Sequence, residues 1–317
     1  MDSAKIFTNR KMLFISAVFC CLLWGSAYPG VKNGYLLFHI APDDIPSKMV
    51  FAGYRFALAG AIVLALAIAS KRKAFSLNKR NILEITLLGL TQTTLQYIFF
   101  YIGLSYTTGV KGSIMNATGT FFSVIIAHFL YRNDKLNTNK IAGCLIGFAG
   151  VMIVNFSKDL LNFSFSFKGE GAVIFSAFIL SVASIYGKKI TQTLDSMVVT
   201  GYQLLIGGLF LILIGAVNHG AISGFTLKST ALLLYLAVLS SIAFSLWTVL
   251  LKYNKVGEVT VFNFLIPVFG AFLSAIFLNE SILEYKNAAA LVLVSAGIWL
   301  VNRTANKDLI KMKRCNS

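Results

Sequence analysis

The chain has 317 residues, of which 57% are apolar and only 13% are charged. Its mean hydropathy of +0.76 is far above that of a water-soluble domain, so the composition excludes an ordinary soluble protein. The net charge of +16 could indicate a nucleic-acid partner, but this composition leaves no soluble fold to display a basic patch, and we expect no nucleic acid to bind.

Ten apolar stretches follow one another along the chain, separated by short polar loops. A helix of roughly 20 apolar residues crosses about 30 Å of hydrocarbon. In chain order the stretches cover residues 12–35, 46–70, 82–103, 110–131, 141–156, 171–188, 197–217, 229–251, 259–278 and 287–301. They predict an all-α integral membrane protein with ten transmembrane helices. We expect Pro29 to interrupt the first of them, because proline lacks the backbone N–H that a helix interior uses.

The basic residues indicate which loops face the cytoplasm. With the N-terminus inside, 20 of the 28 Lys and Arg residues fall on the cytoplasmic side and seven on the outer side, while Arg55 lies within a span. This bias follows the positive-inside rule. It predicts a multi-pass protein of the cytoplasmic (plasma) membrane with both termini in the cytoplasm. In the alternative, the first span is a signal peptide cleaved near Gly25-Ser26-Ala27, which would leave nine crossings.

The sequence contains an internal repeat. Residues 106–155 align without a gap on residues 253–302, with nine identical pairs among 50. Residues 48–66 align on residues 196–214 at nearly the same offset, which places Gly53 on Gly201 and Gly60 on Gly208. Because each copy, 1–156 and 157–317, has five predicted crossings, the second copy must enter the membrane from the opposite side. Such inverted repeats let a central site open to each face in turn, although a duplication can also serve stability alone.

A solute site in the middle of a membrane needs a few polar groups among aromatic walls. Asn116 and Asn263 occupy equivalent positions in the repeat, and Arg55 is the one cation clearly inside a span. Gln92 and Gln96 are four residues apart and therefore share a helical face. The predicted substrate-binding residues are Trp24, Tyr28, Arg55, Gln92, Gln96, Tyr97, Tyr101, Asn116, Trp247 and Asn263.

Each of these side chains also has a structural interpretation. Amides can join neighbouring helices, and aromatic rings can pack in the interior or form a belt at the membrane interface. Arg55 can snorkel outward or cap another helix. Spacing alone leaves these alternatives open.

The predicted spans contain few residues that could serve catalysis or bind a cofactor or metal. They contain almost no acidic residue and a single histidine, so we expect no enzyme. The chain has no Gly-rich phosphate loop and no paired cysteine spacing, so we expect no cofactor, metal or disulfide framework. The expected partners are a small-molecule substrate and membrane lipid, with the protein a monomer or a homodimer. A solute channel or facilitator is the main alternative to a carrier, although a channel is expected to show a ring of charges or a carbonyl filter.

Short motifs in both halves resemble the drug/metabolite transporter superfamily, in particular proteins with paired EamA domains. The first half is similar at Leu23-Trp24-Gly25-Ser26-Ala27-Tyr28 and at Arg55. The second half is similar at Ile266-Pro267-Val268-Phe269, Phe277-Leu278-Asn279-Glu280 and Ala296-Gly297. Thr120 and Asn133 depart from the Pro and Glu that the family often has in the first half. The resemblance implies a ten-helix carrier with a central cavity, similar to exporters of aromatic and other amino acids.

Overall fold

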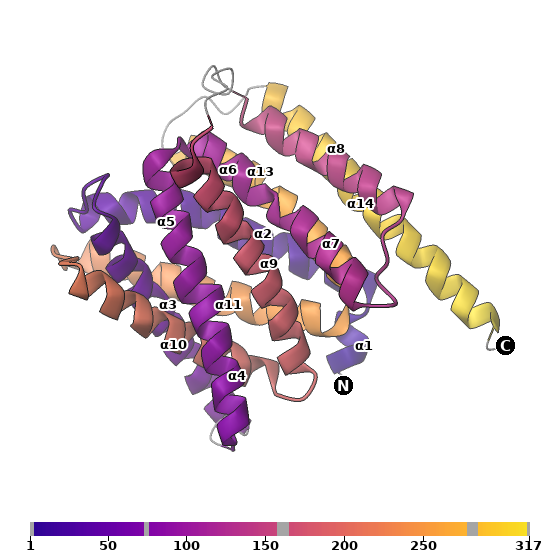
Figure 1. The fold of residues 1–317 in the computed structure, drawn as a ribbon, viewed down its shortest axis with the longest axis horizontal. Helices are drawn as coiled ribbons and strands as arrows, with labels where there is room; N and C mark the ends of the chain where they lie inside the picture. The colour runs from indigo at the N-terminus through magenta and orange to yellow at the C-terminus, as the bar shows by residue number, and fades with distance from the viewer. Residues whose placement is uncertain (1–2, 73–75, 157–164, 278–284, 316–317) are drawn as a thin grey trace.

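Every element of the computed structural model is a helix (Figure 1). The structure describes residues 3–72, 76–156, 165–277 and 285–315, and within these ranges it has no strand. Seven helices are long and apolar enough to cross a membrane: Arg10–Leu37, Ile45–Ala69, Lys111–Leu130, Phe167–Thr191, Ser196–Val217, Leu227–Tyr253 and Val256–Ser274. Two shorter apolar helices cover Thr138–Val154 and Ala288–Arg303. The expectation of an all-helical chain with membrane-spanning helices is confirmed, while residues 278–280, which carry part of the family motif, lie outside the described ranges.

The elements follow one another in chain order with short connections. They are α1 (Ser3–Phe7), α2 (Arg10–Leu37), α3 (Ile45–Ala69), α4 (Lys79–Gly89), η1 (Leu90–Leu95), α5 (Gln96–Tyr106), α6 (Gly109–Ala117), α7 (Gly119–Leu130), α8 (Thr138–Val154), η3 (Phe167–Gly171), α9 (Ala172–Thr191), α10 (Ser196–Val217), α11 (Leu227–Tyr253), α12 (Val256–Thr260), η4 (Val261–Phe264), α13 (Leu265–Phe277) and α14 (Tyr285–Cys315).

Three of the predicted spans are built in pieces, and the fourth span is one of them because it is divided between α6 and α7. In the third, the π-helical η1 joins α4 to α5, and the Thr94 hydroxyl in η1 donates to the Gly207 carbonyl oxygen at 3.0 Å. In the ninth, a 3₁₀ segment, η4, precedes Pro267 in the first turn of α13. A proline ring clashes with the carbonyl four residues earlier in a regular α-helix, which explains why the backbone tightens there.

The expected interruption at Pro29 was wrong. Helix α2 runs without a break from Arg10 to Leu37 and contains Pro29. Proline removes only one hydrogen bond of the ladder, and close packing on both sides supports the backbone. A Cβ placed on Gly25 would lie 2.6 Å from Phe269 Cβ, and one on Gly30 would lie 3.0 Å from Leu236 Cδ2. Neighbouring helices therefore hold α2 in shape around the proline.

The helices pack in a pattern dominated by two close pairs, α3 with α10 and α8 with α14 (Figure 1). Glycines allow the α3–α10 contact, because a Cβ on Gly53 would lie 2.7 Å from the Gly208 carbonyl oxygen and one on Gly60 would lie 2.6 Å from that of Gly201. Helix α2 packs on α11 and α13, and α9 packs on α5 and α7. The backbone of α3 therefore touches that of α10 directly, as small residues allow in membranes.

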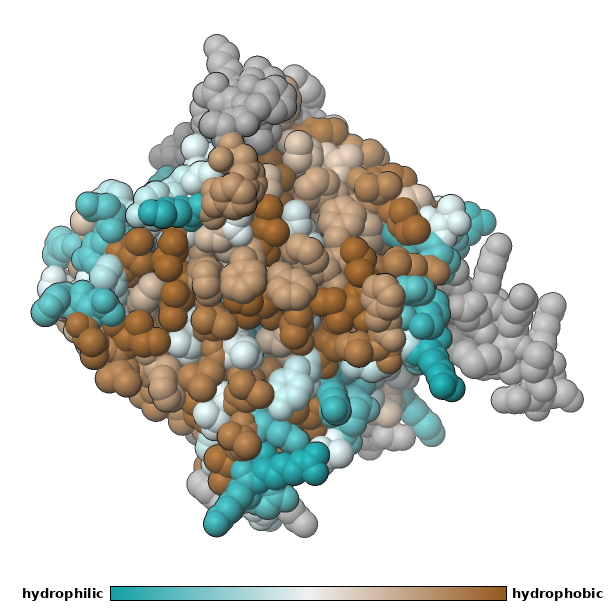
Figure 2. Space-filling view, in the orientation of Figure 1, coloured by the Kyte–Doolittle hydropathy of each residue, from teal (hydrophilic) through white to brown (hydrophobic). Residues whose placement is uncertain are grey.

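The surface carries many large apolar side chains. Figure 2 shows a broad apolar area across the middle of the visible face, with hydrophilic residues gathered at its edges. Exposed examples include Phe129 at 76%, Leu213 at 56% and Ile15 at 60%. Soluble monomers rarely expose a contiguous apolar surface of this kind, so these side chains are suited to contact lipid.

Candidate functional site

Aromatic rings from four helices meet near the centre of the molecule. We call Trp24, Phe56, Tyr97, Phe244 and Trp247 the aromatic cluster. The Trp24 ring lies 5.5 Å from Phe244 and 5.1 Å from Trp247, and the Phe56 ring lies 6.0 Å from Phe244 and 4.7 Å from Tyr97. All four contacts are edge-on or tilted, the arrangements that aromatic pairs favour. Rings from α2, α3, α5 and α11 therefore form one continuous apolar surface.

The position of this cluster follows from where its members sit in their helices. Phe56 is the twelfth of the 25 residues of α3, and Trp24 is the fifteenth of the 28 residues of α2. At 1.5 Å per residue, Phe56 lies roughly 16 Å from the start of α3, which is about half the thickness of a hydrocarbon layer. A helix that crosses the membrane thus carries these rings to its middle.

Arg55 adjoins the aromatic cluster and is almost fully buried, with 5% of its surface exposed. Its Nε donates a hydrogen bond of 2.7 Å to Ser240 Oγ on α11, and its guanidinium carbon lies 5.0 Å from the Phe56 ring centre. Tyr35, Tyr97 and Tyr101 are close enough to interact electrostatically with its charge. Arg55 forms no ion pair with any acidic residue in the described part of the chain.

Two further predicted residues lie beside this centre. Tyr101 is buried next to Tyr97, with ring centres 5.8 Å apart. Tyr28 is 38% exposed and packs against Gly270 of α13, where an added Cβ would lie 3.1 Å from its ring. The structure therefore brings Trp24, Tyr97, Tyr101, Trp247 and Arg55 together, with Tyr28 at their margin.

The two glutamines both face α9, as their four-residue spacing predicts. Gln96 donates through Nε2 to Ser176 Oγ at 2.9 Å, so its amide joins two helices. Gln92 instead lines a cavity of about 10 Å³ together with Gln203, Trp247 and Lys188, a volume that holds about one water molecule. Of the two, Gln92 is the one whose side chain faces open space near the aromatic cluster.

Asn116 on α6 and Asn263 on η4 are half-buried, and neither side-chain amide forms a hydrogen bond to another described residue. The structure therefore gives no sign that these amides join helices. No ring contact or hydrogen bond among the described residues connects either of them to the aromatic cluster. The amides of the two asparagines make no hydrogen bond to another described residue, and a solute site would need such available polar groups.

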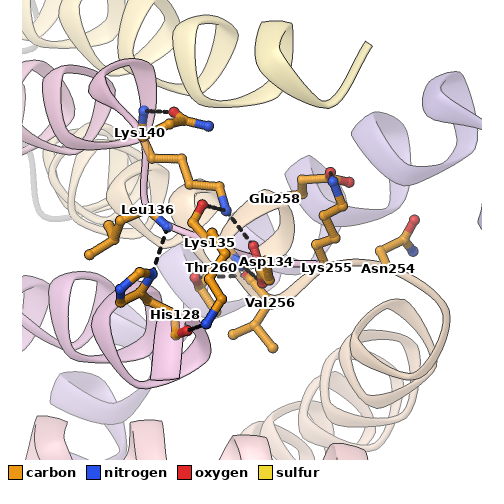
Figure 3. Close-up of polar contacts among 12 residues, drawn as sticks. His128, Asp134, Lys135, Leu136, Lys140, Asn254, Lys255, Val256, Glu258 and Thr260 are labelled. Carbon is orange, nitrogen blue, oxygen red and sulfur yellow. Dashed lines mark hydrogen bonds and ion pairs between the residues drawn. The ribbon is translucent and has the colours of Figure 1, made fainter. Parts of the chain in front are cut away.

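A second polar group lies where the loop after α7 meets α12 (Figure 3). The Asp134 carboxylate pairs with the Lys140 ammonium, and the side chains of this pair are 2% and 6% exposed. The second Asp134 oxygen accepts a 3.0 Å hydrogen bond from the Gly257 backbone N–H. Lys140 also donates to the Lys135 carbonyl oxygen at 2.8 Å. This Asp134–Lys140 pair therefore attaches the loop to a segment more than a hundred residues later in the sequence.

Sequence reasoning did not single out Ser240, Tyr35 or Asp134. Ser240 is a polar residue in the middle of an apolar helix, and that signal could have identified it as the partner of Arg55. Tyr35 ends a span, where an interfacial position is the ordinary interpretation. Asp134 stands in a polar loop, where acidic residues are usually solvated. Only the packing of the loop against α12 shows that it is buried.

Comparisons with known proteins place this geometry in a family. The EamA-like transporter family matches residues 11–156 and again residues 167–303. An uncharacterized transporter of Archaeoglobus fulgidus is 30% identical over 284 residues, which are 88% of this chain and 93% of the relative. A Salmonella typhimurium protein named probable amino-acid metabolite efflux pump is 26% identical over 318 residues, 94% of this chain and 98% of that protein.

A crystal structure of a protein 18% identical to this chain has the same fold, with a TM-score of 0.76 over 94% of this chain and 99% of the other. The resemblance drawn from the short sequence motifs is thus confirmed, and the protein is a transporter rather than an enzyme. With matches over both halves and 30% identity to a transporter of nearly the same length, the chain belongs to the EamA-like transporter family.

Proposed function

We propose that the protein is an alternating-access secondary transporter that exports amino acids or related small metabolites across the cytoplasmic membrane. Ten crossings form two inverted five-helix repeats, and the solute site lies between them. One observation carries this proposal: the two closest helix pairs in the fold are pairs of equivalent helices, each related by the internal repeat.

The glycine contacts between α3 and α10 have the symmetry that inverted repeats require. The alignment equates Gly53 with Gly201 and Gly60 with Gly208. In the structure Gly53 meets Gly208, and Gly60 meets Gly201. Exchanging the two repeats converts the first contact into the second. A two-fold axis between these helices accounts for both contacts.

The contacts between α8 and α14 have the same exchange symmetry as those between α3 and α10. Gly150 is equivalent to Gly297 and Gly143 to Ala290 in the alignment. A Cβ on Gly143 would lie 2.7 Å from the Gly297 carbonyl oxygen, and one on Gly150 would lie 2.9 Å from that of Ala290. Exchange of the repeats again turns one contact into the other. Two independent crossings with one symmetry support a pair of inverted modules that can rock about a central site.

The position of the chain ends supports a common side for both termini. Arg10 at the start of α2 donates a 3.1 Å hydrogen bond to the Asn302 carbonyl oxygen on α14. Figure 1 likewise shows α1 and the distal end of α14 at the same edge of the molecule. The excess of basic residues in the loops on this side supports a cytoplasmic location for it. An even number of crossings requires this arrangement.

The substrate class rests on the relative named as an amino-acid metabolite efflux pump and on the rings and polar groups at the centre of the fold. A carrier of this kind binds solute with aromatic walls and a few polar side chains. We retain Asn116, Asn263 and Gln92 as proposed ligands in addition to Arg55 and the aromatic cluster.

Counterflow in liposomes tests the proposal. The purified protein is reconstituted in vesicles loaded with an unlabelled mixture of amino acids and their carboxylate relatives, and labelled solute is added outside in trace amounts. A carrier accumulates label transiently above equilibrium, because internal solute returns the site to the outer face. A channel gives simple equilibration, and that result would refute alternating access.

The topology has its own test. The four native cysteines, which include Cys315 in the C-terminal tail, are first replaced by serine. Single cysteines are then introduced before residue 10 and after residue 303 and labelled in intact cells with a membrane-impermeant reagent. Protection of both tails, relieved by permeabilisation, is expected. Labelling of one tail only would mean an odd number of crossings and would remove the inverted repeat.

A further inference from the structure

We propose that Arg55 binds the carboxylate of the transported solute, and that the site selects a carboxylate carried on an apolar or aromatic body without needing an ammonium group. The inference deepens the proposed transport function and rests on it. It begins from one unusual feature, a buried cation at mid-membrane whose terminal nitrogens have no hydrogen-bond partner among the described residues.

The hydrogen bonding of Arg55 is incomplete. The guanidinium has five N–H donors, and only Nε is used, in the 2.7 Å bond to Ser240. Neither terminal nitrogen bonds to another described residue. Among the described residues, the only fully enclosed side-chain nitrogen or oxygen without a hydrogen-bond partner is Ser245 Oγ. The terminal nitrogens of Arg55 therefore keep accessible surface, although 95% of the residue is covered.

The repeat provides an internal comparison. Gln203 is the counterpart of Arg55 on α10, is 2% exposed, and donates to Thr93 Oγ1 at 3.3 Å. At this equivalent position the side chain joins two helices through one amide donor. A structural role therefore needs only a neutral amide at this place in the fold. The charge of Arg55 and its unpaired donors are in excess of what packing requires.

An unpaired charge in this position is energetically unfavourable. Buried charges are normally paired, because removing an ion from water costs several kcal/mol in a protein interior. Charged residues within membrane helices usually face a cavity or a substrate pathway. A bound anion would offset this cost, and the planar guanidinium offers two parallel N–H donors that match the two oxygens of a carboxylate.

The surroundings define the rest of the solute. Tyr35, Tyr97 and Tyr101 add hydroxyl groups near the guanidinium, and the aromatic cluster continues from Phe56 as an apolar wall. The acidic side chains that the structure describes all lie in loops or within the first six residues of a helix; they are Asp43, Asp44, Glu84, Asp134, Glu170, Asp195 and Glu258. No described acid is therefore placed to pair with a solute ammonium. The net charge of the site is positive, which favours a net anion over a zwitterion and rejects a cation.

Three solutes that share one ring isolate the charge. Phenylpropionate is an anion, phenylalanine a zwitterion and phenylethylamine a cation. The full-length protein in detergent is titrated with each, and tryptophan fluorescence is recorded, since Trp24 and Trp247 belong to the cluster. We expect phenylpropionate to bind at least as tightly as phenylalanine, and phenylethylamine to bind at least about tenfold more weakly than phenylpropionate.

Arg55→Gln installs the residue that the second repeat uses. We expect it to weaken phenylpropionate binding by roughly 10- to 100-fold, the usual effect of losing a charge-assisted hydrogen bond, and to leave phenylethylamine unchanged. Arg72→Gln is the matched control, because Arg72 is about half exposed and pairs with Asp195 at 2.9 Å. It should change none of the three affinities. The melting temperature of Arg55→Gln should not fall, since the variant removes an unpaired buried charge.

Several outcomes would overturn the proposal. Phenylethylamine binding as tightly as phenylpropionate, no binding of phenylpropionate, or an Arg55→Gln variant that weakens all three solutes equally would each assign Arg55 a structural role. Counterflow of phenylpropionate in wild-type vesicles keeps the two proposals apart. Charge-selective binding without counterflow would refute the transport mechanism, whereas counterflow without charge selectivity would refute only the carboxylate site.

Discussion

Removal of the Asp134 charge is the sharpest test of the packing described above. Asp134→Asn preserves the size of the side chain but removes the carboxylate that pairs with the buried Lys140 ammonium, which then keeps only a longer-range electrostatic interaction with Glu258. Both side chains of the pair are almost fully enclosed, at 2% and 6% exposure, so solvent screens their interaction little. Breaking a buried pair by removing one partner typically costs about 3–5 kcal/mol. Lys140 retains the Lys135 carbonyl as an acceptor at 2.8 Å, which places our expectation near the lower end, at about 3 kcal/mol.

The free energy of unfolding is measured by circular dichroism as denaturing detergent is titrated into purified protein in mild detergent. Glu84→Gln is the control, because the Arg80–Glu84 pair is 85% and 28% exposed and such pairs contribute only about 0.3–0.5 kcal/mol. The double variant Asp134→Asn/Lys140→Met removes both charges and should recover most of the loss.

Two results would refute this reasoning. If Asp134→Asn and Glu84→Gln lower the unfolding free energy by the same amount, the pair is not buried in the folded protein. If the double variant is no more stable than Asp134→Asn alone, the loss does not come from an uncompensated Lys140 charge. The first result would also mean that the loop after α7 is not fixed to α12.

Three further predictions address the helix contacts and the polar residues. Gly60→Leu should lower stability by about 1–3 kcal/mol or more, since its side chain would meet the backbone of α10. The control Gly171→Ala should not lower stability, because the nearest atom lies 3.7 Å from the added carbon, an ordinary contact distance. Equal melting temperatures of the two variants would contradict the close crossing of α3 and α10. Gln96→Leu should cost about 0.5–1.5 kcal/mol, because Ser176 Oγ loses the amide donor but still donates to the Gln96 backbone carbonyl at 3.0 Å; an unchanged melting temperature would argue against the Gln96–Ser176 side-chain bond. Asn116→Ala and Asn263→Ala should leave stability within about 0.5 kcal/mol, since neither amide is hydrogen-bonded, but should reduce counterflow; unchanged transport of every accepted solute would remove both residues from the proposed site.

The candidate site was predictable in part. Trp24 stands in the middle of α2, so its depth in the membrane follows from helix length and position. Trp247 is the twenty-first of the 27 residues of α11, and only the packing of the helices brings it to Trp24. Helical periodicity likewise predicted that Gln92 and Gln96 face the same neighbour. It did not predict what that neighbour offers: Ser176 engages Gln96, and a small cavity lies beside Gln92.

Other features needed the folded chain. Pro29 was expected to interrupt α2, but packing at Gly25 and Gly30 keeps the helix continuous. Asp134 reads as a solvated loop residue, and only the approach of α12 encloses it. Both differences have one origin: propensity and hydropathy describe a segment by itself, whereas burial depends on segments that are distant in the sequence.

The sequence by itself determined that the chain is helical, apolar on its surface and similar to a known family of transporters, because these properties depend on composition, on runs of about 20 apolar residues and on short motifs. It also contained the internal repeat. Only the tertiary structure decided which polar groups are satisfied, pairing Gln203 with Thr93 while leaving the terminal nitrogens of Arg55 open. The physical reason is that a hydrogen bond needs two groups within about 3 Å, and the partner of each of these side chains stands on another helix.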